Sequence, residues 1–174
     1  KCSDFSYKKN GKKYVSEIFE SSNIKSFTFG NDVEYIPAYL CLMMSNLTSV
    51  IIPEDSQLMY INSGVFDGCT NLTSMVIPKA TIYIGDEAFY GCTNLTSITI
   101  PESVTSLGYG IFIGTKITEA HIPNNLPLPE RMFERCSELT AVTIPSSITK
   151  IEGLTFSGCS KLKTVTLPKK LYMI

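Results

Sequence analysis

The sequence lacks a strong excess of either charge, and it lacks a long run of apolar residues. Its 15 basic and 16 acidic residues give a formal net charge of −1. A chain this close to neutral has no uniform positive field with which to capture nucleic acid or anionic lipid, so we expect no nucleic-acid partner. No stretch approaches the roughly 18 consecutive apolar residues of a membrane span, so we expect no direct membrane insertion by this segment.

Residues and motifs that carry catalysis are also scarce. Histidine occurs once, as His121. The sequence contains no G-x-x-x-x-G-K phosphate loop, no H-E-x-x-H zinc motif and no G-x-S-x-G nucleophile motif. Its acidic residues near turns follow no calcium-loop spacing and form no paired carboxylates in register. We therefore expect no enzymatic activity, no metal site and no cofactor.

What the sequence does contain is enough apolar material for one sizeable core, with 44% hydrophobic residues. The charge is unevenly spread, because residues 26–115 hold eight acidic residues and only one basic residue, Lys79. The chain begins KCSDFSYKKNGKK, with neither an apolar signal core nor an initiating Met. We therefore expect it to be a piece of a longer protein.

An internal repeat organises the chain. Six prolines recur at intervals of 22 to 25 residues, and each follows an apolar-x-x-apolar-x-apolar pattern such as LTSVII or LTSITI. Gly30 extends the same register one unit earlier, which makes seven copies. Repeats of this length and pattern are typical of leucine-rich repeats. The sequence predicts a β-rich leucine-rich repeat solenoid of about seven repeats of 22–25 residues, with a parallel sheet on one face and short strands or 3₁₀ turns on the return face. The prolines are Pro53, Pro78, Pro101, Pro123, Pro145 and Pro168.

Alternation within each pattern predicts which side chains are buried. Val50 and Ile52, for example, point inward, as do the equivalent residues of later units as far as Val165 and Leu167. The residues between them form a surface that we call the outer strand face. Its residues are Ser26 and Thr28, Ser49 and Ile51, Ser74 and Val76, Ser97 and Thr99, Glu119 and His121, Ala141 and Thr143, Thr164 and Thr166.

The return segments are expected to supply the opposite wall of the core. Apolar pairs such as Ile82 and Ile84 precede a recurring phenylalanine, and Cys41 takes its place in the earliest full unit. Residues 85–89 suggest a single helical turn. The aromatic column consists of Phe66, Phe89, Phe112, Phe133 and Phe156.

Four of the six cysteines share one repeat position, and stacking of the repeats should align them in a column. Their parallel Cβ directions oppose disulfide bonds, and their spacing is unlike that of metal-binding clusters. We expect buried free thiols, with a disulfide or a metal site as the alternatives. The four are Cys69, Cys92, Cys136 and Cys159; Cys2 lies outside the array and has a missing segment or another chain as its candidate partner.

The two ends of the array differ from its middle. Asn10-Gly11, flanked by alternating apolar residues, predicts a hairpin that covers the open edge of the first repeat. We therefore divide the chain into a capping hairpin segment, residues 1–22, and the repeat array, residues 23–174. The last unit stops six residues after Pro168 without a polar capping repeat. We expect the polypeptide to continue or to pair its exposed end.

The amino-acid sequence of one repeat is distinctive. The run F-x-G-C-T-N-L-T-S-I-T-I-P-E-S-V-T-S-L-G, from Phe89 to Gly108, resembles the BspA-like leucine-rich repeat family. The resemblance covers residues 24–174, although residues 112–117 lack the cysteine and are one residue shorter. It implies a surface protein of the kind found in mucosal bacteria and protists, located at the cell surface or secreted, with an adhesive role that extends to extracellular-matrix proteins.

Two functions remain open for such a chain. The first is a binding module that holds a protein or glycan through the outer strand face, and the second is a structural spacer whose function resides in flanking domains. The apolar pair Ile51 and Val76 is the most partner-like part of the face. Glu119 is a nearby carboxylate on the same strand face as His121, but His121 has no matched nucleophile and we expect it to be an ordinary exposed surface residue. The candidate partner-binding residues are Ile51, Val76, Thr99, Glu119, His121 and Thr143.

Three asparagines begin N-L-T sequons at the turns into strands. Asn46, Asn71 and Asn94 would permit glycan attachment in a secreted eukaryotic protein. The alternative is a structural role, in which each side chain hydrogen-bonds its own backbone and supports the turn.

Overall fold

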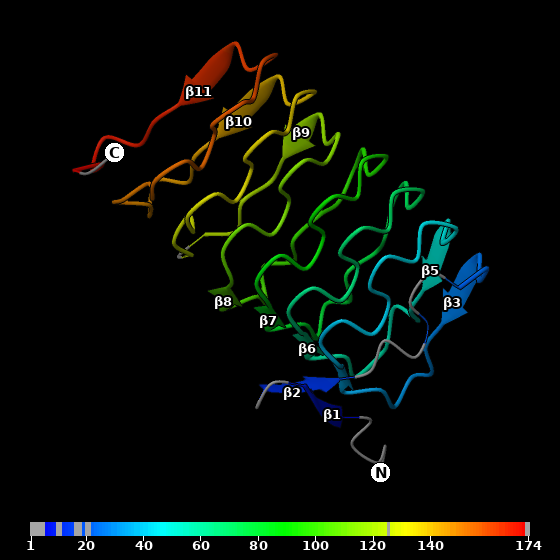
Figure 1. The fold of residues 1–174 in the computed structure, drawn as a ribbon. Coiled ribbons are helices and arrows are strands. Elements are labelled where there is room, and N and C mark those ends of the chain that lie inside the picture. Colours follow the sequence, from blue (N-terminus) through cyan, green and yellow to red (C-terminus); the bar gives the residue numbers. More distant parts are fainter. Residues whose placement is uncertain (1–5, 10–11, 16–18, 20–21, 125, 173–174) are drawn as a thin grey trace.

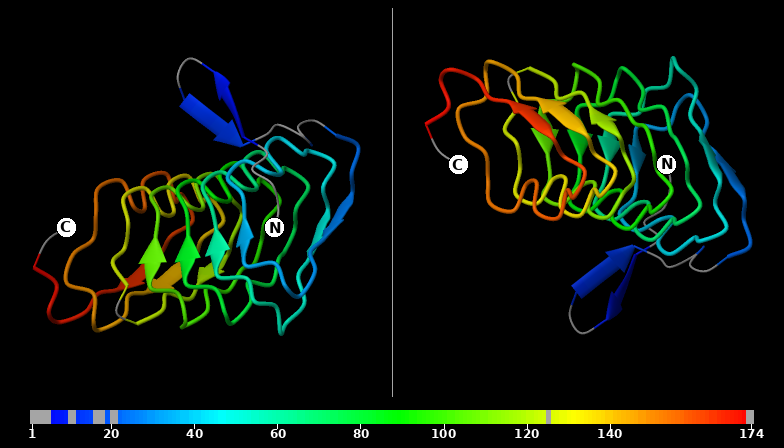
Figure 2. Two further views of the ribbon diagram at one scale, coloured as in Figure 1. Left: turned by 90° about the horizontal axis from the view of Figure 1, so that it is seen from below. Right: turned by 90° about the horizontal axis from the view of Figure 1, so that it is seen from above.

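A computed structural model describes residues 6–9, 12–15, 19, 22–124 and 126–172. The chain winds into coils that lie side by side, from the N-terminal coils at one end to the C-terminal coils at the other (Figures 1 and 2). The predicted leucine-rich repeat solenoid is confirmed, with about six turns. Seven repeated strand positions are consistent with this number because they bound six complete turns. Among the described residues, strands and turns make up all the regular structure, and no helix has the length and apolarity needed to cross a bilayer.

Parallel strands from successive coils form the outer strand face. Equivalent residues lie in columns, since Ala141 is opposite both Glu119 and Thr164. The predicted alternation is visible in the burial of these strands, where Val50 and Val142 are buried between exposed or half-exposed neighbours. The strands of this face are β3 (Ser26–Thr28), β5 (Ser49–Ile51), β9 (Glu119–Ala120), β10 (Ala141–Thr143) and β11 (Thr164–Thr166).

A second parallel sheet forms the opposite wall of the core, as the return segments predict. Its four strands are hydrogen-bonded in the unbroken order β4-β6-β7-β8. Ile61 and Ile84 are opposite each other and fully buried, while Tyr60 and Tyr83 point away from the core and lie 6.5 Å apart between ring centroids. The strands are β4 (Tyr35–Ile36), β6 (Tyr60–Ile61), β7 (Tyr83–Ile84) and β8 (Ser106–Leu107).

The third side of each coil is a run of tight turns. Backbone N–H groups on this side donate to carbonyls of the next coil, as from Phe66 to Ala88 and from Phe89 to Ile111, each at 2.9 Å. The helical turn predicted at residues 85–89 is wrong, because Glu87 has a φ of 53° and therefore leaves the right-handed helical region. Left-handed residues recur twice in each coil, in one column of Tyr39, Gly64, Glu87, Gly110, Arg131 and Leu154 and a second of Met43, Gly68, Gly91, Gly114, Arg135 and Gly158.

Phenylalanine rings stack along the axis of the core. The ring centroids of Phe66, Phe89, Phe112, Phe133 and Phe156 follow one another at 5.4 to 5.8 Å, with interplanar angles of 20° or less. Each such contact contributes about 0.5–1.5 kcal/mol beyond the burial of its area. Because one ring comes from each coil, the column stabilises only coils that lie next to each other. The predicted aromatic column is thus confirmed.

Free thiols fill the neighbouring column of the core. The four cysteines of this column each donate the S–H to a carbonyl of the preceding coil, as from Cys92 to Phe66 and from Cys136 to Phe112, both at 3.1 Å. All five described cysteines are free, which confirms the predicted thiols; Cys2 lies outside the described residues. Burial raises the pKa of the Cys41 and Cys136 thiols to about 12, so both stay protonated. Thr115 replaces the missing cysteine and lies 3.3 Å from the Cys136 sulfur.

The N-terminal hairpin is a sheet of its own. Strands β1 (Ser6–Lys9) and β2 (Lys12–Val15) pair antiparallel, while the Asn10-Gly11 loop between them lies outside the described residues. The described hairpin strands pair with neither β3 nor β4, and Figure 2 shows them standing apart from the stack. The structure therefore does not support a hairpin that pairs with the open edge. Phe19 packs there instead, edge-on against Phe27 at 5.4 Å. The division of the chain at residue 22 stays a prediction.

The last described coil departs from the burial pattern. Val165 and Leu167 were expected to face the core, but they are 36% and 47% exposed. Val165 lies in β11, the outermost strand of its sheet, Leu167 follows directly after this strand, and no further described coil covers them.

Candidate functional site

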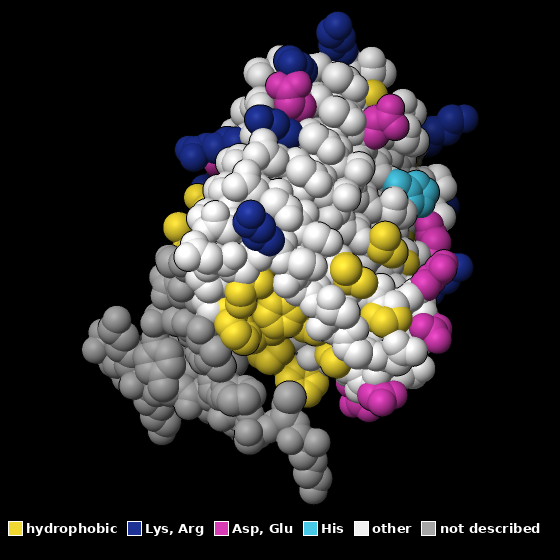
Figure 3. Space-filling model, turned by 90° about the vertical axis from the view of Figure 1, so that its right-hand side faces the viewer, with side chains coloured by type: hydrophobic (Ala, Val, Ile, Leu, Met, Phe, Trp, Pro, Cys, Tyr) yellow, Lys and Arg dark blue, Asp and Glu magenta, His cyan; other side chains and the backbone are white. Residues whose placement is uncertain are grey.

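The outer strand face carries all six residues that the sequence proposes for partner binding. Every one is solvent-exposed, and two are aliphatic, with Ile51 50% exposed and Val76 66% exposed. Figure 3 shows hydrophobic side chains gathered below the single histidine and a row of acidic side chains along the neighbouring edge. The face is therefore a mixed apolar and acidic surface.

Backbone pairing is interrupted twice across this face. The hydrogen-bonded groups are β3 with β5, an isolated bridge between Ser74 and Ser97, and β9 with β10 and β11. No other strand pairing occurs on this face among the described residues. The opposite sheet is continuous beside the first interruption, but beside the second it ends at β8, and Leu128 of the next coil bridges Ile151 instead. Turn-side hydrogen bonds, such as that from the Phe112 N–H to the Met132 carbonyl at 3.0 Å, still join these two coils.

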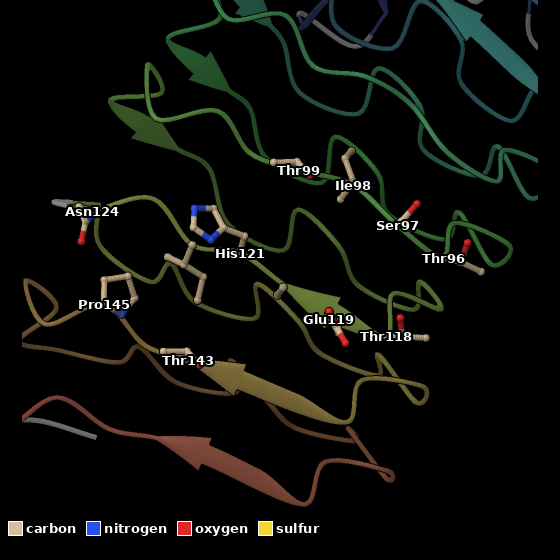
Figure 4. Close-up of a pocket in the computed structure, with 12 residues that line it drawn as sticks. Thr96, Ser97, Ile98, Thr99, Thr118, Glu119, His121, Asn124, Thr143 and Pro145 are labelled. Atoms are coloured by element: carbon tan, nitrogen blue, oxygen red, sulfur yellow. The ribbon is translucent and has the colours of Figure 1, made fainter.

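The second interruption opens a pocket, which we call the slot. It lies between residues 96–99 on one side and residues 118–121 on the other, and it encloses about 580 Å³. The last backbone hydrogen bond before it runs from the Thr118 N–H to the Thr96 carbonyl at 3.3 Å. Figure 4 shows Thr99, Glu119, His121 and Thr143 around this space. Four of the six candidate residues therefore line one site.

A small residue explains why the slot opens at this coil. Inward positions of the other strands carry larger side chains, such as Met75, Ile98 and Val142, whereas β9 carries Ala120. Ile98 is consequently only partly buried, and a small void separates it from Ala120 and Phe133. The turn before β9, residues 112–117, is also one residue shorter, as noted in the sequence. Both differences weaken the fit between these two coils.

A glutamate that the sequence analysis missed contacts two residues of the slot from outside its lining. Glu102 Oε1 lies 3.1 Å from His121 Nε2, and Glu102 Oε2 accepts a hydrogen bond from the Asn124 N–H at 3.3 Å. His121 therefore contacts Glu102 rather than the neighbouring Glu119, whose side chain has no hydrogen-bond or ion-pair partner among the described residues. The sequence feature that could have indicated this glutamate is its position in the repeat, because Glu102 directly follows Pro101 as Glu54 follows Pro53. After each proline the chain turns back beside the strand end of the next coil.

An apolar pocket adjoins the slot. It encloses about 700 Å³, contains Val76, Pro101 and Glu102, and shares Ser97, Ile98 and Thr99 with the slot. Its one basic residue, Lys79, pairs with Glu54 at 3.8 Å. Ile51 lines neither pocket, because the first interruption separates β5 from Ser74. The two pockets therefore adjoin each other, and their lining residues come from four coils, because Thr143 and Pro145 also line the slot.

The sequon asparagines form a ladder between coils. Asn71 Nδ2 donates to the Ser45 carbonyl at 2.7 Å, and Asn94 Nδ2 donates to Asn71 Oδ1 at 3.4 Å. Asn46 similarly donates to the Ser22 carbonyl. The sequence analysis proposed that each asparagine side chain hydrogen-bonds its own backbone. In the structure these amides hydrogen-bond to the preceding coil instead. The structure thus gives the N-L-T positions a role in stacking.

Ionisable side chains elsewhere in the described residues form no candidate metal site. No group of three or more His, Cys, Asp or Glu side chains able to hold a metal ion occurs in the described part of the chain. Burial, and then the nearby Glu87 carboxylate, raise the pKa of Asp67 to about 6. Asp67 lies on the turn side of the solenoid, away from the slot.

Comparison with known proteins agrees with the repeat geometry. Residues 1–78 and 59–174 match the family described as BspA type Leucine rich repeat region (6 copies). The chain belongs to the BspA-type leucine-rich repeat family. No curated protein matches the chain.

Solved structures show the same fold. A leucine-rich repeat protein from Bacteroides ovatus superposes with a TM-score of 0.82 at 26% identity, over 97% of this chain and 45% of that one. A leucine-rich repeat protein from T. pallidum gives 0.78 at 22% identity, over 87% of this chain and 74% of that one. The BspA-type chain thus spans less than half the length of the Bacteroides ovatus protein.

Within this family the repeats are a protein-interaction scaffold rather than a catalytic centre. His121, the one candidate general base, contacts the Glu102 carboxylate, and no described hydroxyl or thiol hydrogen-bonds to it. The chemistry available on the outer strand face of this BspA-type chain is binding through aliphatic groups, hydroxyls and carboxylates.

Proposed function

We propose that this chain is the binding module of a surface-located or secreted protein and that its outer strand face holds a partner protein. One observation carries the proposal: exposed Val76 lines one of two adjoining pockets on this face, and exposed Ile51 occupies the equivalent position on the preceding strand. Exposed aliphatic groups beside a depression are typical of interaction sites. The resemblance to surface proteins adds extracellular-matrix proteins as candidate partners.

Repetition suits this role. Equivalent residues recur along the face at the strand spacing of about 4.8 Å, so one extended surface offers several similar contacts. Several weak contacts on one rigid face also give an apparent affinity that each contact alone would lack.

The test is a comparison of two surfaces on the whole chain. We expect the variant Ile51→Ser with Val76→Ser to bind extracellular-matrix proteins at least about tenfold more weakly than the wild type, because each aliphatic group contributes about 1.5–3 kcal/mol when buried. The matched control is Tyr35→Ser with Tyr60→Ser, which removes similarly exposed side chains from the opposite sheet. Binding is measured by surface plasmon resonance against a panel of matrix proteins and glycans.

Two results would contradict the proposal. Unchanged binding of the Ile51 and Val76 variant to every protein that the wild type binds would favour the spacer role. Loss of binding in the tyrosine control would move the interaction to the opposite sheet.

A further inference from the structure

The slot has an unbalanced negative charge. Glu102 is held by His121 and the Asn124 N–H, whereas Glu119 projects from β9 with no described partner. No lysine or arginine lines the slot. In the adjoining pocket, Lys79 is drawn toward Glu54. The site therefore presents carboxylates to a ligand without an internal cation to neutralise Glu119.

The surroundings extend this charge. Acidic residues follow the prolines at the ends of two outer strands, with Glu54 and Asp55 after Pro53 and Glu102 after Pro101, and Figure 3 shows acidic side chains along this edge of the face. A local excess of one sign attracts a partner segment of the opposite sign and raises its encounter rate. Charge complementarity thus favours a cationic segment over an acidic or a neutral one.

The adjoining apolar pocket adds a second requirement. Val76 is 66% exposed and Ile98 is partly buried, and both line the pocket next to the slot. A branched aliphatic side chain placed there covers apolar surface on both residues. A ligand that carries only positive charge would leave this surface in water.

The positions of Val76 and His121 set the separation between the aliphatic side chain and the cation of a ligand. Val76 and His121, which holds Glu102, occupy equivalent positions two strands apart, with Thr99 between them. At the paired-strand spacing of about 4.8 Å they would be about 9.6 Å apart, and this is a minimum because the slot separates the second pair of strands. An extended chain rises about 3.3 Å per residue. A segment that crosses the strands therefore spans this distance in about three residues.

From these observations we infer that the slot and the adjoining pocket form one recognition site for an extended polypeptide segment with a Lys or Arg about three residues from a branched aliphatic side chain. Glu119 and Glu102 hold the cation, and Val76 and Ile98 cover the aliphatic group. This inference rests on the proposed function, since it specifies the protein ligand of the same face.

The test starts from peptides rather than from a known partner. A display library of random linear peptides is selected on the immobilised whole chain. We expect the enriched peptides to carry Lys or Arg about three residues from Val, Ile or Leu. Enrichment without a cation, or no enrichment above the uncoated surface, overturns the inference.

Charge-neutral variants then locate the contact. For a selected peptide, we expect Glu119→Gln to weaken the affinity roughly twofold to fivefold, as for an exposed ion pair, and more at low salt. The matched control is Glu130→Gln, which changes the net charge equally at an exposed position outside both pockets. Replacing the peptide cation by Gln should abolish the effect of Glu119→Gln. Equal effects of the two variants, or an effect that survives in the neutral peptide, would contradict the assignment.

Failure of this inference is distinguishable from failure of the proposed function. If Ile51→Ser with Val76→Ser abolishes binding of a matrix protein while Glu119→Gln and Glu102→Gln leave it unchanged, the face binds protein but the cation site is wrong. If glycans bind and peptides do not, the polypeptide ligand is wrong.

Discussion

Single side chains adapt the shared repeat to each coil. Arg131 and Arg135 occupy both left-handed positions of one coil, where most other coils have at least one glycine. Their guanidinium groups lie 2.6 and 3.5 Å from the buried Glu134 carboxylate between them. A buried carboxylate is costly unless it is paired, and these two arginines supply that pairing for Glu134.

Asp67 is a residue whose charge works against folding. Its pKa of about 6 lies above the ordinary value of 3.8, so the folded state holds the proton more tightly than the unfolded state does. The resulting stability is fully present below about pH 4 and is lost as the pH rises through about 6. We expect Asp67→Asn to remove this decline and to stabilise the protein by roughly 1 kcal/mol at neutral pH, a value reduced for partial solvent exposure.

The measurement is urea unfolding of wild type and variant at several pH values between about 4 and 7. Asp55→Asn serves as the control, because it makes the same change at a solvent-exposed position. A free energy of unfolding that rises with pH across this range in the wild type but not in Asp67→Asn would contradict the prediction.

At the scale of elements, the tight turns on the third side of each coil depend on residues with a left-handed backbone conformation. Gly91 has a φ of 65°, and a Cβ there would meet nothing closer than 3.8 Å, so Gly91→Ala introduces backbone strain without a clash. We expect a loss of about 1–2 kcal/mol. Leu154 has a φ of 59° and is 53% exposed, so Leu154→Gly should gain about 0.5 kcal/mol after the entropy of glycine is subtracted.

Both changes in the free energy of unfolding are to be measured by urea denaturation followed by circular dichroism. The opposite signs of the two changes are the informative result. A loss of stability in both variants would show that side-chain contacts, rather than φ, govern these turns.

Strand β9 is the weakest element of the outer strand face because Ala120 leaves a void beside Ile98. We expect Ala120→Val to stabilise the protein by about 1 kcal/mol through added apolar burial, which raises Tm by about 2–4 °C. Ala141→Val on β10 gives the same gain in strand propensity at an exposed outward position and should change stability by less than about 0.5 kcal/mol. Scanning calorimetry separates the two, and equal shifts would show that the void contributes nothing.

At the scale of the whole molecule, stability is shared between neighbouring coils. Phe112 is 1% exposed and stacks on Phe89 and Phe133 at 5.7 Å, so Phe112→Ala interrupts the column in its middle. We expect a loss of about 3–5 kcal/mol. Phe156 is partly exposed and contacts Phe133 on one side, so Phe156→Ala should cost less than half as much.

Chemical denaturation of both variants checks this comparison. In a linear array each coil contacts only its neighbours, so an interior change removes two contacts and a terminal change removes one. Equal losses would show that the coils do not unfold in this nearest-neighbour manner.

Much of the architecture follows from local patterns in the sequence. The alternation at Val50 and Val142 places these residues in the core because successive strand residues point to opposite faces. The phenylalanine and cysteine columns follow from one residue type at one position per repeat. The outward exposure of Ile51, Val76 and His121 follows from the same alternation.

Only the tertiary structure decided how adjacent coils fit together. The slot, the Glu102–His121 contact and the Asn71–Ser45 hydrogen bond each join residues of different coils. Their geometry depends on the volume of side chains such as Ala120 and on how far each coil is offset from the next, which no single repeat encodes. The sequence determined the coil and its two faces because those depend on local periodicity, whereas the site arises where two unequal coils meet.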